Sequence, residues 1–407
     1  MLEYIKKLVD KNKWVMYCVS LMIGLAMGII NPLATTHMAR NNAGDILVGI
    51  ISSTYFLFMA IGSVYVYKKQ RGRDLRMLMI FALAMAAVSS VIFPLFTNFI
   101  LWFLLMSLMG TGISLNMVGI QTAMHKVTDS ENKALVSGIY SFCFAFGFVL
   151  SAVIGPAVYE NISWMAFLMG SLGLCIAAFL VYFRLKNLLV IPENDGEKTE
   201  EREVFSKITL ALLGAFAYGF SETTLVSLYP LFMSRLNYSS VQSGYALGIF
   251  IVGSIIGTIP VSYLADRIGR KKCLTLVISV SLIPIVGIMV FDNFIAKMIF
   301  SFVAGFTVGP IYPLSLALSV QDLTGKELIS GTAFFTFAYG IGSTTGPFLS
   351  SVAMRYLGNK YIFSITLLFF VSMLLYMIGE SIRLRKKAKN EDLEQYDESL
   401  SNGGLIE

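Results

Sequence analysis

The sequence is poor in charged residues. Lys, Arg, Asp and Glu make up 14% of the 407 residues, whereas about 25% is usual in a soluble domain. So few charges cannot cover a water-facing surface, which excludes an ordinary soluble protein. The basic residues also form no face with interleaved aromatic side chains, so we expect no nucleic-acid partner despite the formal net charge of +6.

Residues that bind metals or form disulfides are also scarce. The four cysteines, Cys18, Cys143, Cys175 and Cys273, are dispersed in or beside apolar segments without CxxC or metal-site spacing. The sequence has no HExxH motif, no Gly-x-Ser-x-Gly elbow with a partnered His and no Walker loop. We therefore expect no metal, no cofactor and no enzymatic activity.

Long apolar segments dominate instead. Hydrophobic residues make up 56% of the chain, and a hydrocarbon core of about 30 Å is crossed by about 20 such residues. Twelve segments qualify: 14–38, 45–67, 77–96, 100–123, 134–158, 163–183, 208–233, 240–264, 274–291, 297–320, 329–352 and 361–382. They predict an all-α integral membrane protein with 12 transmembrane helices.

The distribution of basic residues predicts the orientation of these spans. With both termini inside, five of the 31 Lys and Arg fall outside, and the other 26 fall on the cytoplasmic side. The five are Arg40, Arg235, Lys297, Arg355 and Lys360. Because basic residues are retained on the cytoplasmic side, we expect a multi-pass protein of the cell membrane with both termini in the cytoplasm.

Two polar segments divide the chain. Residues 187–206 separate six spans from six, and residues 389–407 form an acidic tail. Neither has enough apolar side chains to fold alone. We expect an N-terminal bundle over 1–186, a cytoplasmic linker over 187–206, a C-terminal bundle over 207–388 and a solvated tail over 389–407.

The two halves repeat glycines and prolines in one order. Pro32-Leu33 matches Pro230-Leu231, Gly110 matches Gly305, Gly72 matches Gly269, and the Gly138–Gly147 pair matches Gly331–Gly340. The offsets are 198, 195, 197 and 193 positions. Near-constant offsets over half the chain predict two bundles related by a parallel repeat.

The loop after the eighth span carries a family motif. Residues 262–274 read SYLADRIGRKKCL, with five charged residues within seven positions. The order Asp-Arg-x-Gly-Arg-Lys after an apolar helix resembles the loop signature of the major facilitator superfamily (MFS). The resemblance implies the MFS fold, in which two pseudo-symmetric six-helix bundles enclose a site between them.

The same resemblance implies a gating role for this loop. Asp266 would hold the inner gate shut against the start of the eleventh span, while Gly269 makes the turn and Arg267 and Arg270 pair with acids or lipid headgroups. In the first-half loop, Gly72 and Arg73 fit the pattern. Lys69 stands where the acid should be, and a Lys cannot bind a positive helix start.

Two spans carry glycine-proline elements that resemble those of bacterial drug:proton antiporters. They are GFVLSAVIGP, with Gly147, Gly155 and Pro156, and GIGSTTGP, with Gly340, Gly342, Gly346 and Pro347. Close helix packing through small residues explains them equally well. Met106 occupies the position in the fourth span where many such antiporters carry an arginine.

Glu222 is the sequence's main candidate for function. It lies in the middle of the seventh span, where an acid costs roughly 2.5–3.5 kcal/mol to insert and is by default a functional-site candidate. Tyr218, Glu222, Leu225 and Tyr229 follow a 4-3-4 spacing and share one helix face. Glu222 can carry a proton, bind a cationic substrate, or be a protonated acid satisfied by a neighbouring helix.

Further polar residues are candidates for a cavity. Asn31, Asn116, Tyr312 and Tyr339 lie in spans that line the centre of an MFS transporter. An interhelical hydrogen bond is an equally good explanation for each. His37 lies at a span end, where a surface position is expected.

Together these features predict a secondary transporter that works by alternating access. We expect proton-coupled efflux of an amphiphilic compound, such as a drug or a secreted metabolite like a siderophore, by a monomer embedded in the lipid bilayer. Proton-coupled uptake of a small organic solute is the alternative. A non-transporting receptor or a membrane enzyme on the same scaffold is a third hypothesis, which the missing catalytic groups disfavour.

Overall fold

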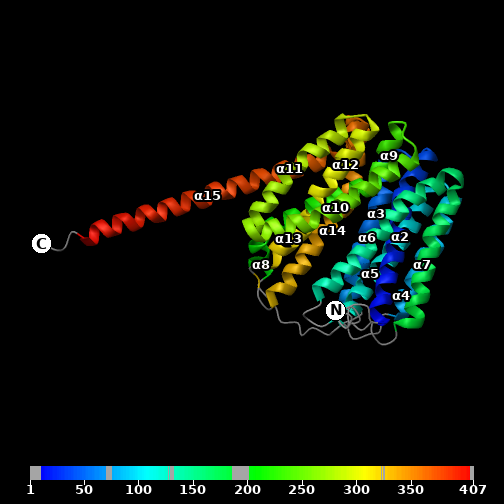
Figure 1. Cartoon of the computed structure of the whole chain (residues 1–407), viewed down its shortest axis with the longest axis horizontal. Coiled ribbons are helices and arrows are strands. Elements are labelled where there is room, and N and C mark those ends of the chain that lie inside the picture. Colours follow the sequence, from blue (N-terminus) through cyan, green and yellow to red (C-terminus); the bar gives the residue numbers. More distant parts are fainter. Residues whose placement is uncertain are drawn as a thin grey trace.

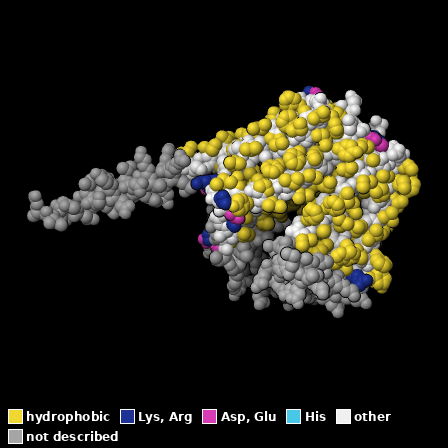
Figure 2. Space-filling model, in the orientation of Figure 1, with side chains coloured by type: hydrophobic (Ala, Val, Ile, Leu, Met, Phe, Trp, Pro, Cys, Tyr) yellow, Lys and Arg dark blue, Asp and Glu magenta, His cyan; other side chains and the backbone are white. Residues whose placement is uncertain are grey.

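Long apolar helices make up the computed structural model, which describes residues 11–69, 76–126, 128, 133–185, 201–321, 323 and 326–403. Within these ranges no strand occurs. Eleven helical segments are long and apolar enough to cross a membrane. Hydrophobic side chains cover most of the bundle surface seen in Figure 2, and the coloured charged groups lie near its ends. The expected all-α membrane fold is confirmed.

The N-terminal half consists of α2 (Lys11–Arg40), α3 (Asp45–Lys69), α4 (Arg76–Ile92) with η1 (Phe93–Leu95), α5 (Phe99–Lys126), α6 (Lys133–Asn161) and α7 (Ser163–Arg184). The C-terminal half consists of α8 (Glu201–Lys207), α9 (Thr209–Arg235), α10 (Ser240–Ile268), α11 (Arg270–Val290), α12 (Phe294–Val308), α13 (Ile311–Val320), α14 (Lys326–Leu357), η3 (Asn359–Phe363) and α15 (Ser364–Gly403). Below, the linker end is the end at which α8 lies, and the far end is the opposite one, which carries Arg40 and Arg235 (Figure 1).

Two elements differ from the expected spans. The tenth is broken into α12 and α13 at Gly309-Pro310, because a proline has no N–H to continue the helix ladder. The acidic tail from residue 389 is helical as far as Gly403, as a continuation of α15 that projects from the bundle (Figure 1). The sequence predicted a solvated tail without a fold of its own, and its described part is this extension of α15.

Helix packing is repeated in the two halves. In the N-terminal half α2 packs on α6, α3 on α5 and α4 on α7; in the C-terminal half α9 packs on α14, α10 on α12 and α11 on α15. Across the junction, α3 packs on α14 and α6 on α10. Each half therefore contributes its second and fifth spans to the junction, which confirms the duplicated six-helix plan.

Glycines set the register of the repeat. A Cβ on Gly110 would lie within 3.0 Å of the carbonyl oxygen of Tyr55, and one on Gly305 equally close to that of Phe250. Each residue of the second pair follows its counterpart by 195 positions. Backbones touch at these points, which only glycine permits.

A second set of glycines corrects the match inferred from the sequence. Gly147 packs on the Leu21 carbonyl, and Gly342 packs on the Phe216 carbonyl, again 195 positions later in both helices. Gly147 therefore corresponds to Gly342. The sequence-based pairing of Gly147 with Gly340 is off by two residues.

The turns at the far end repeat as well. Asn42 follows α2 and Asn237 follows α9, and both have φ of 62°. Asn tolerates this left-handed conformation better than other residues with a Cβ. The two are the non-glycine residues of positive φ in the described chain, and they too are 195 positions apart.

We predict that Gly305→Ala destabilises the protein. The added methyl group would force α12 away from Phe250, and overpacking of this kind costs about 1–3 kcal/mol. Gly138→Ala in α6 is the matched control, because a Cβ there meets nothing within 4 Å. The midpoint of thermal unfolding in detergent should fall for the first variant and hold for the second, and equal midpoints would refute the contact.

Candidate functional site

Two arginines join the halves at the far end. Arg235, in the last turn of α9, pairs through both terminal nitrogens with Asp45, in the first turn of α3, with one N–O distance of 2.7 Å. Arg40, in the last turn of α2, donates to the Ser240 hydroxyl at the start of α10 at 2.9 Å. Arg235 follows Arg40 by 195 positions, and Ser240 follows Asp45 by 195 positions, so the two contacts are equivalent under the internal repeat. We call them the arginine clasps.

Further polar contacts cross the junction beside the clasps. The Ser240 amide donates to Glu160 at 2.7 Å, and the Phe348 amide donates to the Ser53 hydroxyl at 3.0 Å. Deeper in the bundle, the Ser227 hydroxyl donates to Asn31 at 2.7 Å. These contacts close the halves against each other toward the far end.

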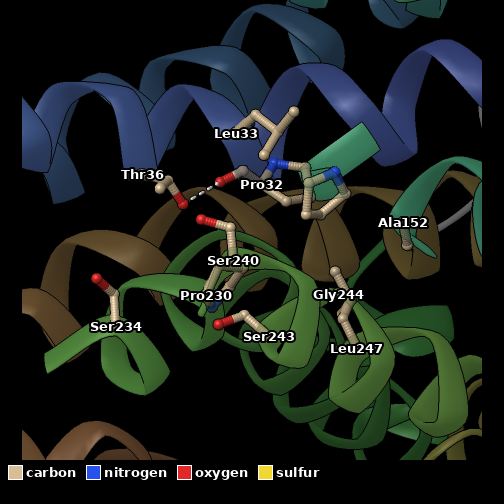
Figure 3. A pocket seen from close by; sticks show the side chains of 11 residues that line it. Pro32, Leu33, Thr36, Ala152, Pro230, Ser234, Ser240, Ser243, Gly244 and Leu247 are labelled. Atoms are coloured by element: carbon tan, nitrogen blue, oxygen red, sulfur yellow. Dashed lines mark hydrogen bonds between the residues drawn. The ribbon is translucent and has the colours of Figure 1, made fainter. Parts of the chain in front are cut away.

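A small pocket lies within this closure. Figure 3 shows Pro32 and Leu33 of α2 near Pro230 of α9, with Ser240 and Gly244 of α10 also around the space. It has room for about one water molecule. It is too small for an organic molecule.

Glu222 of α9 lies among three tyrosines from three helices. The hydroxyl of Tyr339 (α14) donates to Glu222 Oε2 at 2.8 Å. Tyr218 lies one turn before Glu222, with its ring stacked on that of Tyr339. The ring of Tyr312 (α13) lies 5.4 Å from each of the other two, between centroids. The structure thus brings four of the predicted candidates together, and we call them the Glu222 cluster.

The break in the tenth span places Tyr312 in this cluster. Gly309-Pro310 ends α12, and α13 starts with Ile311, so Tyr312 stands in the first turn after the break. Its ring also packs on Phe335 at 5.4 Å. Substrate sites of transporters often lie where a membrane helix is broken near the middle of the bilayer. The Gly309-Pro310 pair in the middle of the predicted tenth span is the sequence feature that could have predicted this break.

The cluster is not sealed in the packed core. Glu222 and the three tyrosines each keep part of their surface accessible, whereas the neighbouring residues Ser221 and Thr223 are buried. Ser227, which bonds Asn31, follows Glu222 by five residues, or about 7.5 Å along the helix. The cluster therefore lies on the linker side of the closure.

Three other predicted cavity residues have structural contacts. Asn116 is buried and donates to the carbonyls of Met79 and Gly112 at 3.2 and 2.8 Å. Tyr229 is buried and bonds the Ser301 hydroxyl at 2.7 Å. Asn31 holds the junction through Ser227. These residues lie outside the Glu222 cluster.

Lys297 was expected in an outer loop, but its side chain is fully buried near the far end of α12. Its Nζ donates to the Ile288 carbonyl at the end of α11 at 2.5 Å and lies 4.6 Å from the centre of the Phe232 ring. The expected surface position of His37 is also wrong. His37 is buried and bonds Tyr159 at 3.0 Å.

The charged loop is described in its second-half copy, whereas Gly72 and Arg73 lie outside the described residues. Gly269 makes the turn between α10 and α11 with φ of 92°. Arg270 donates to the Ala317 carbonyl at 2.7 Å, and Arg267 lies 4.6 Å from the Tyr263 ring centre. Asp266 is exposed and forms no hydrogen bond or ion pair with a described residue.

Helix packing offers a second partner for Asp266. Because α10 packs on α6 whereas α14 packs on α3 and α9, the start of α6 is a candidate beside the expected start of the eleventh span. The latch itself stays a prediction.

The glycine-proline elements lie at helix contacts. Gly346 packs on the Phe220 carbonyl, Gly155 on Ile29, and Gly340 on Ala60. Pro156 contacts Gly244, and the Pro347 carbonyl contacts Gly49, both across the junction between halves. These contacts support the packing explanation.

Comparisons with known proteins identify the family. The profile of the Major Facilitator Superfamily matches residues 16–210 and 211–402. YfkF of Bacillus subtilis, an uncharacterized MFS-type transporter, is 23% identical and the match covers 92% of this chain and 96% of YfkF. YcaD of Escherichia coli O17:K52:H18, also an uncharacterized MFS-type transporter, is 23% identical over 84% of this chain and 89% of its own.

Solved structures share the fold. The nucleoside transporter NupG has a TM-score of 0.72 at 14% identity, covering 91% of this chain and 98% of NupG. A bacterial homolog of the human lysosomal transporter Spinster, inward-facing and unoccupied, has a TM-score of 0.68 at 12% identity, covering 91% and 95%. From its duplicated bundles and from these matches, the chain belongs to the Major Facilitator Superfamily and is a transporter of the membrane.

Proposed function

We propose that this transporter expels an amphiphilic organic compound in exchange for protons, with Glu222 as the residue that binds the proton. The observation that supports it most directly is the hydrogen bond from Tyr339 to Glu222 in the middle of the bundle. A carboxyl group there is costly to insert, so it is by default a functional-site candidate. The linker end is then the cytoplasmic side, and the far end is the outer side.

The arrangement of contacts supports an inward-facing state. The arginine clasps and the Asn31–Ser227 bond close the outer side, and the Glu222 cluster lies beyond them toward the cytoplasm. A solute entering from the cytoplasm would meet the tyrosines first. Release outside then requires the clasps to open while the cytoplasmic ends of the halves come together.

Uptake in symport with protons is the second candidate. It would use the same cluster, because a protonated Glu222 and a bound solute can move together as well as in opposition. In symport the solute and the proton occupy the site at the same time, whereas in exchange they occupy it in turn. The three tyrosine rings around one carboxylate support exchange, since a proton on Glu222 removes the charge that holds a cationic or polarised solute.

We predict that the linker end faces the cytoplasm. In cells carrying a variant without its four native cysteines, a membrane-impermeant maleimide added outside should label Asn161→Cys at the far end. It should leave Asp266→Cys at the linker end unlabelled until the membrane is opened. Both positions are exposed. Labelling of Asp266→Cys in intact cells would reverse the orientation.

We predict that Asp45→Asn opens the outer side. It leaves Arg235 without its ionic partner, and charge-assisted bonds of this partly exposed kind contribute about 1–2 kcal/mol. A balanced equilibrium would shift about 5- to 30-fold toward the outward-open state. Paired spin labels at Asn161 and Tyr356, one on each half, would measure the distance.

Asp292→Asn is the matched control for this variant. Asp292 also lies at the far end, and its pairs with Lys297 and Lys360 stay within the C-terminal half. Its loss should leave the distance distribution unchanged. If Asp45→Asn leaves it unchanged too, the Asp45–Arg235 pair is not a gate.

We predict that Glu222→Gln abolishes proton-driven transport. Gln keeps the shape and the hydrogen bond from Tyr339 but cannot bind and release a proton. In inverted vesicles, solute accumulation driven by a pH gradient should collapse, and the solute exchange that remains at equilibrium should lose its pH dependence. Glu327→Gln is the control, because that acid pairs with Lys207 near the linker end. A Glu222→Gln protein that still builds a full gradient would exclude Glu222 as the proton carrier.

A further inference from the structure

We infer that the Glu222 cluster binds organic cations of the amine or quaternary ammonium class. The inference rests on the proposed function, because it takes this cluster as the place where the transported solute binds. It adds the charge and the chemical class of that solute.

The tyrosine rings are placed to contact a cation at the carboxylate. Tyr312 lies 5.4 Å from Tyr218 and 5.4 Å from Tyr339 between ring centroids, and Tyr218 and Tyr339 are stacked at 6.2 Å. Tyr339 donates its hydroxyl to Glu222, and Tyr218 lies one turn before Glu222 on the same helix. A cation is attracted to an aromatic face within about 6 Å of its centre. A group bound at Glu222 therefore has aromatic surface beside it.

The charges in the described spans select against an anion. Acidic and basic side chains there lie in the first or last turns of the spans, with Glu222 in the middle of α9 as the exception. The side chain of Lys297 has no exposed surface. Its ammonium group donates to the Ile288 carbonyl and lies over the Phe232 ring. The site thus carries one negative charge or none, and the described basic side chains lie in the end turns of the spans, away from the middle of α9.

The ligand atoms also select against a metal ion. Ca²⁺ takes six to eight oxygen ligands, and Mg²⁺ near-octahedral oxygen coordination. The described residues contain no group of three His, Cys, Asp or Glu side chains that could hold a metal. One carboxylate among phenol rings suits a single positive charge with apolar substituents, whose surface packs on the rings.

The test measures binding to the purified full-length protein in detergent at fixed pH. The probes are arylammonium cations such as benzyltrimethylammonium, their neutral carbon isosteres such as neopentylbenzene, and arylcarboxylates of similar size. The cations should bind more tightly than both other sets. If no cation of the set binds more tightly than its neutral isostere, the inference is overturned.

A substitution of Tyr312 tests the contact between cation and ring most directly. Its hydroxyl forms no hydrogen bond with a described residue, while its ring packs on Tyr218 and Tyr339. Tyr312→Leu should lower cation affinity about 2- to 30-fold, the range expected for one cation–π contact. Affinity for the neutral isosteres should change much less. Tyr312→Phe keeps the ring and should keep cation affinity within about twofold.

Two controls complete the experiment. Tyr356→Leu removes an exposed tyrosine at the far end and should leave cation affinity unchanged. Glu222→Gln should lower cation affinity and spare the isosteres. An equal loss of cation and isostere affinity in Tyr312→Leu would show loss of packing and overturn the inference. Should Tyr312→Leu fail to fold, the wild-type preference and Tyr312→Phe still decide it.

The outcomes separate this inference from the proposed function. Proton-driven flux of a neutral solute, without any preference for cations, would overturn the cation site and leave proton coupling in place. Cation binding that depends on Tyr312 and Glu222, in a protein whose flux ignores the pH gradient, would keep the cation site and overturn proton coupling.

Discussion

Backbone contact between helices is the constraint on which this structure depends. At Gly110, Gly147, Gly305 and Gly342 a side chain of any size would overlap a carbonyl oxygen on the neighbouring helix. In a membrane, helices gain little from burying apolar side chains, since lipid is equally apolar, and close packing and interhelical hydrogen bonds take over. These glycines therefore fix which helices pair within each half, and in what register.

The junction between the halves combines close packing with polar side-chain contacts. Backbones approach each other across it at Gly244 and Ala152 and at Gly49 and Pro347, and side chains join it at Arg235–Asp45 and Arg40–Ser240. Side-chain contacts at a partly exposed end cost little to break. Alternating access requires such breakable contacts between two rigid halves, since one bundle rocks against the other.

The sequence was sufficient to predict the membrane spans and the duplication, because these follow from apolar length and from repeated glycines and prolines. It also singled out Glu222 as a candidate, because that residue is the one acid in the middle of an apolar segment. It did not predict Lys297 as a buried residue. Charge alone assigned that lysine to a loop, whereas its place is decided by the carbonyl of Ile288 and the ring of Phe232, which come from other helices.

The sequence also could not distinguish Tyr312 and Tyr339, which lie in the Glu222 cluster, from Asn116 and Tyr229. Asn116 forms its hydrogen bonds within the N-terminal half and Tyr229 within the C-terminal half. Spacing along one helix defines a face but not its neighbour. The pairing of α10 with α6 could not be predicted either, since helix pairing across the junction is not a property of either helix alone.

The duplication finally shows where the chemistry is concentrated. Shifting the Glu222 cluster back by 195 positions gives the equivalent residues of the N-terminal half: Ile23 for Tyr218, Met27 for Glu222, Met117 for Tyr312 and Phe144 for Tyr339. All four are apolar. The fold and its clasps are repeated in both halves, but the carboxylate and its tyrosines occur in one. The C-terminal half thus provides the polar contacts of the cluster, and the N-terminal half carries apolar side chains at the corresponding positions, of which Met117 and Phe144 keep part of their surface accessible. Such a division suits a solute with one charged end and one apolar end.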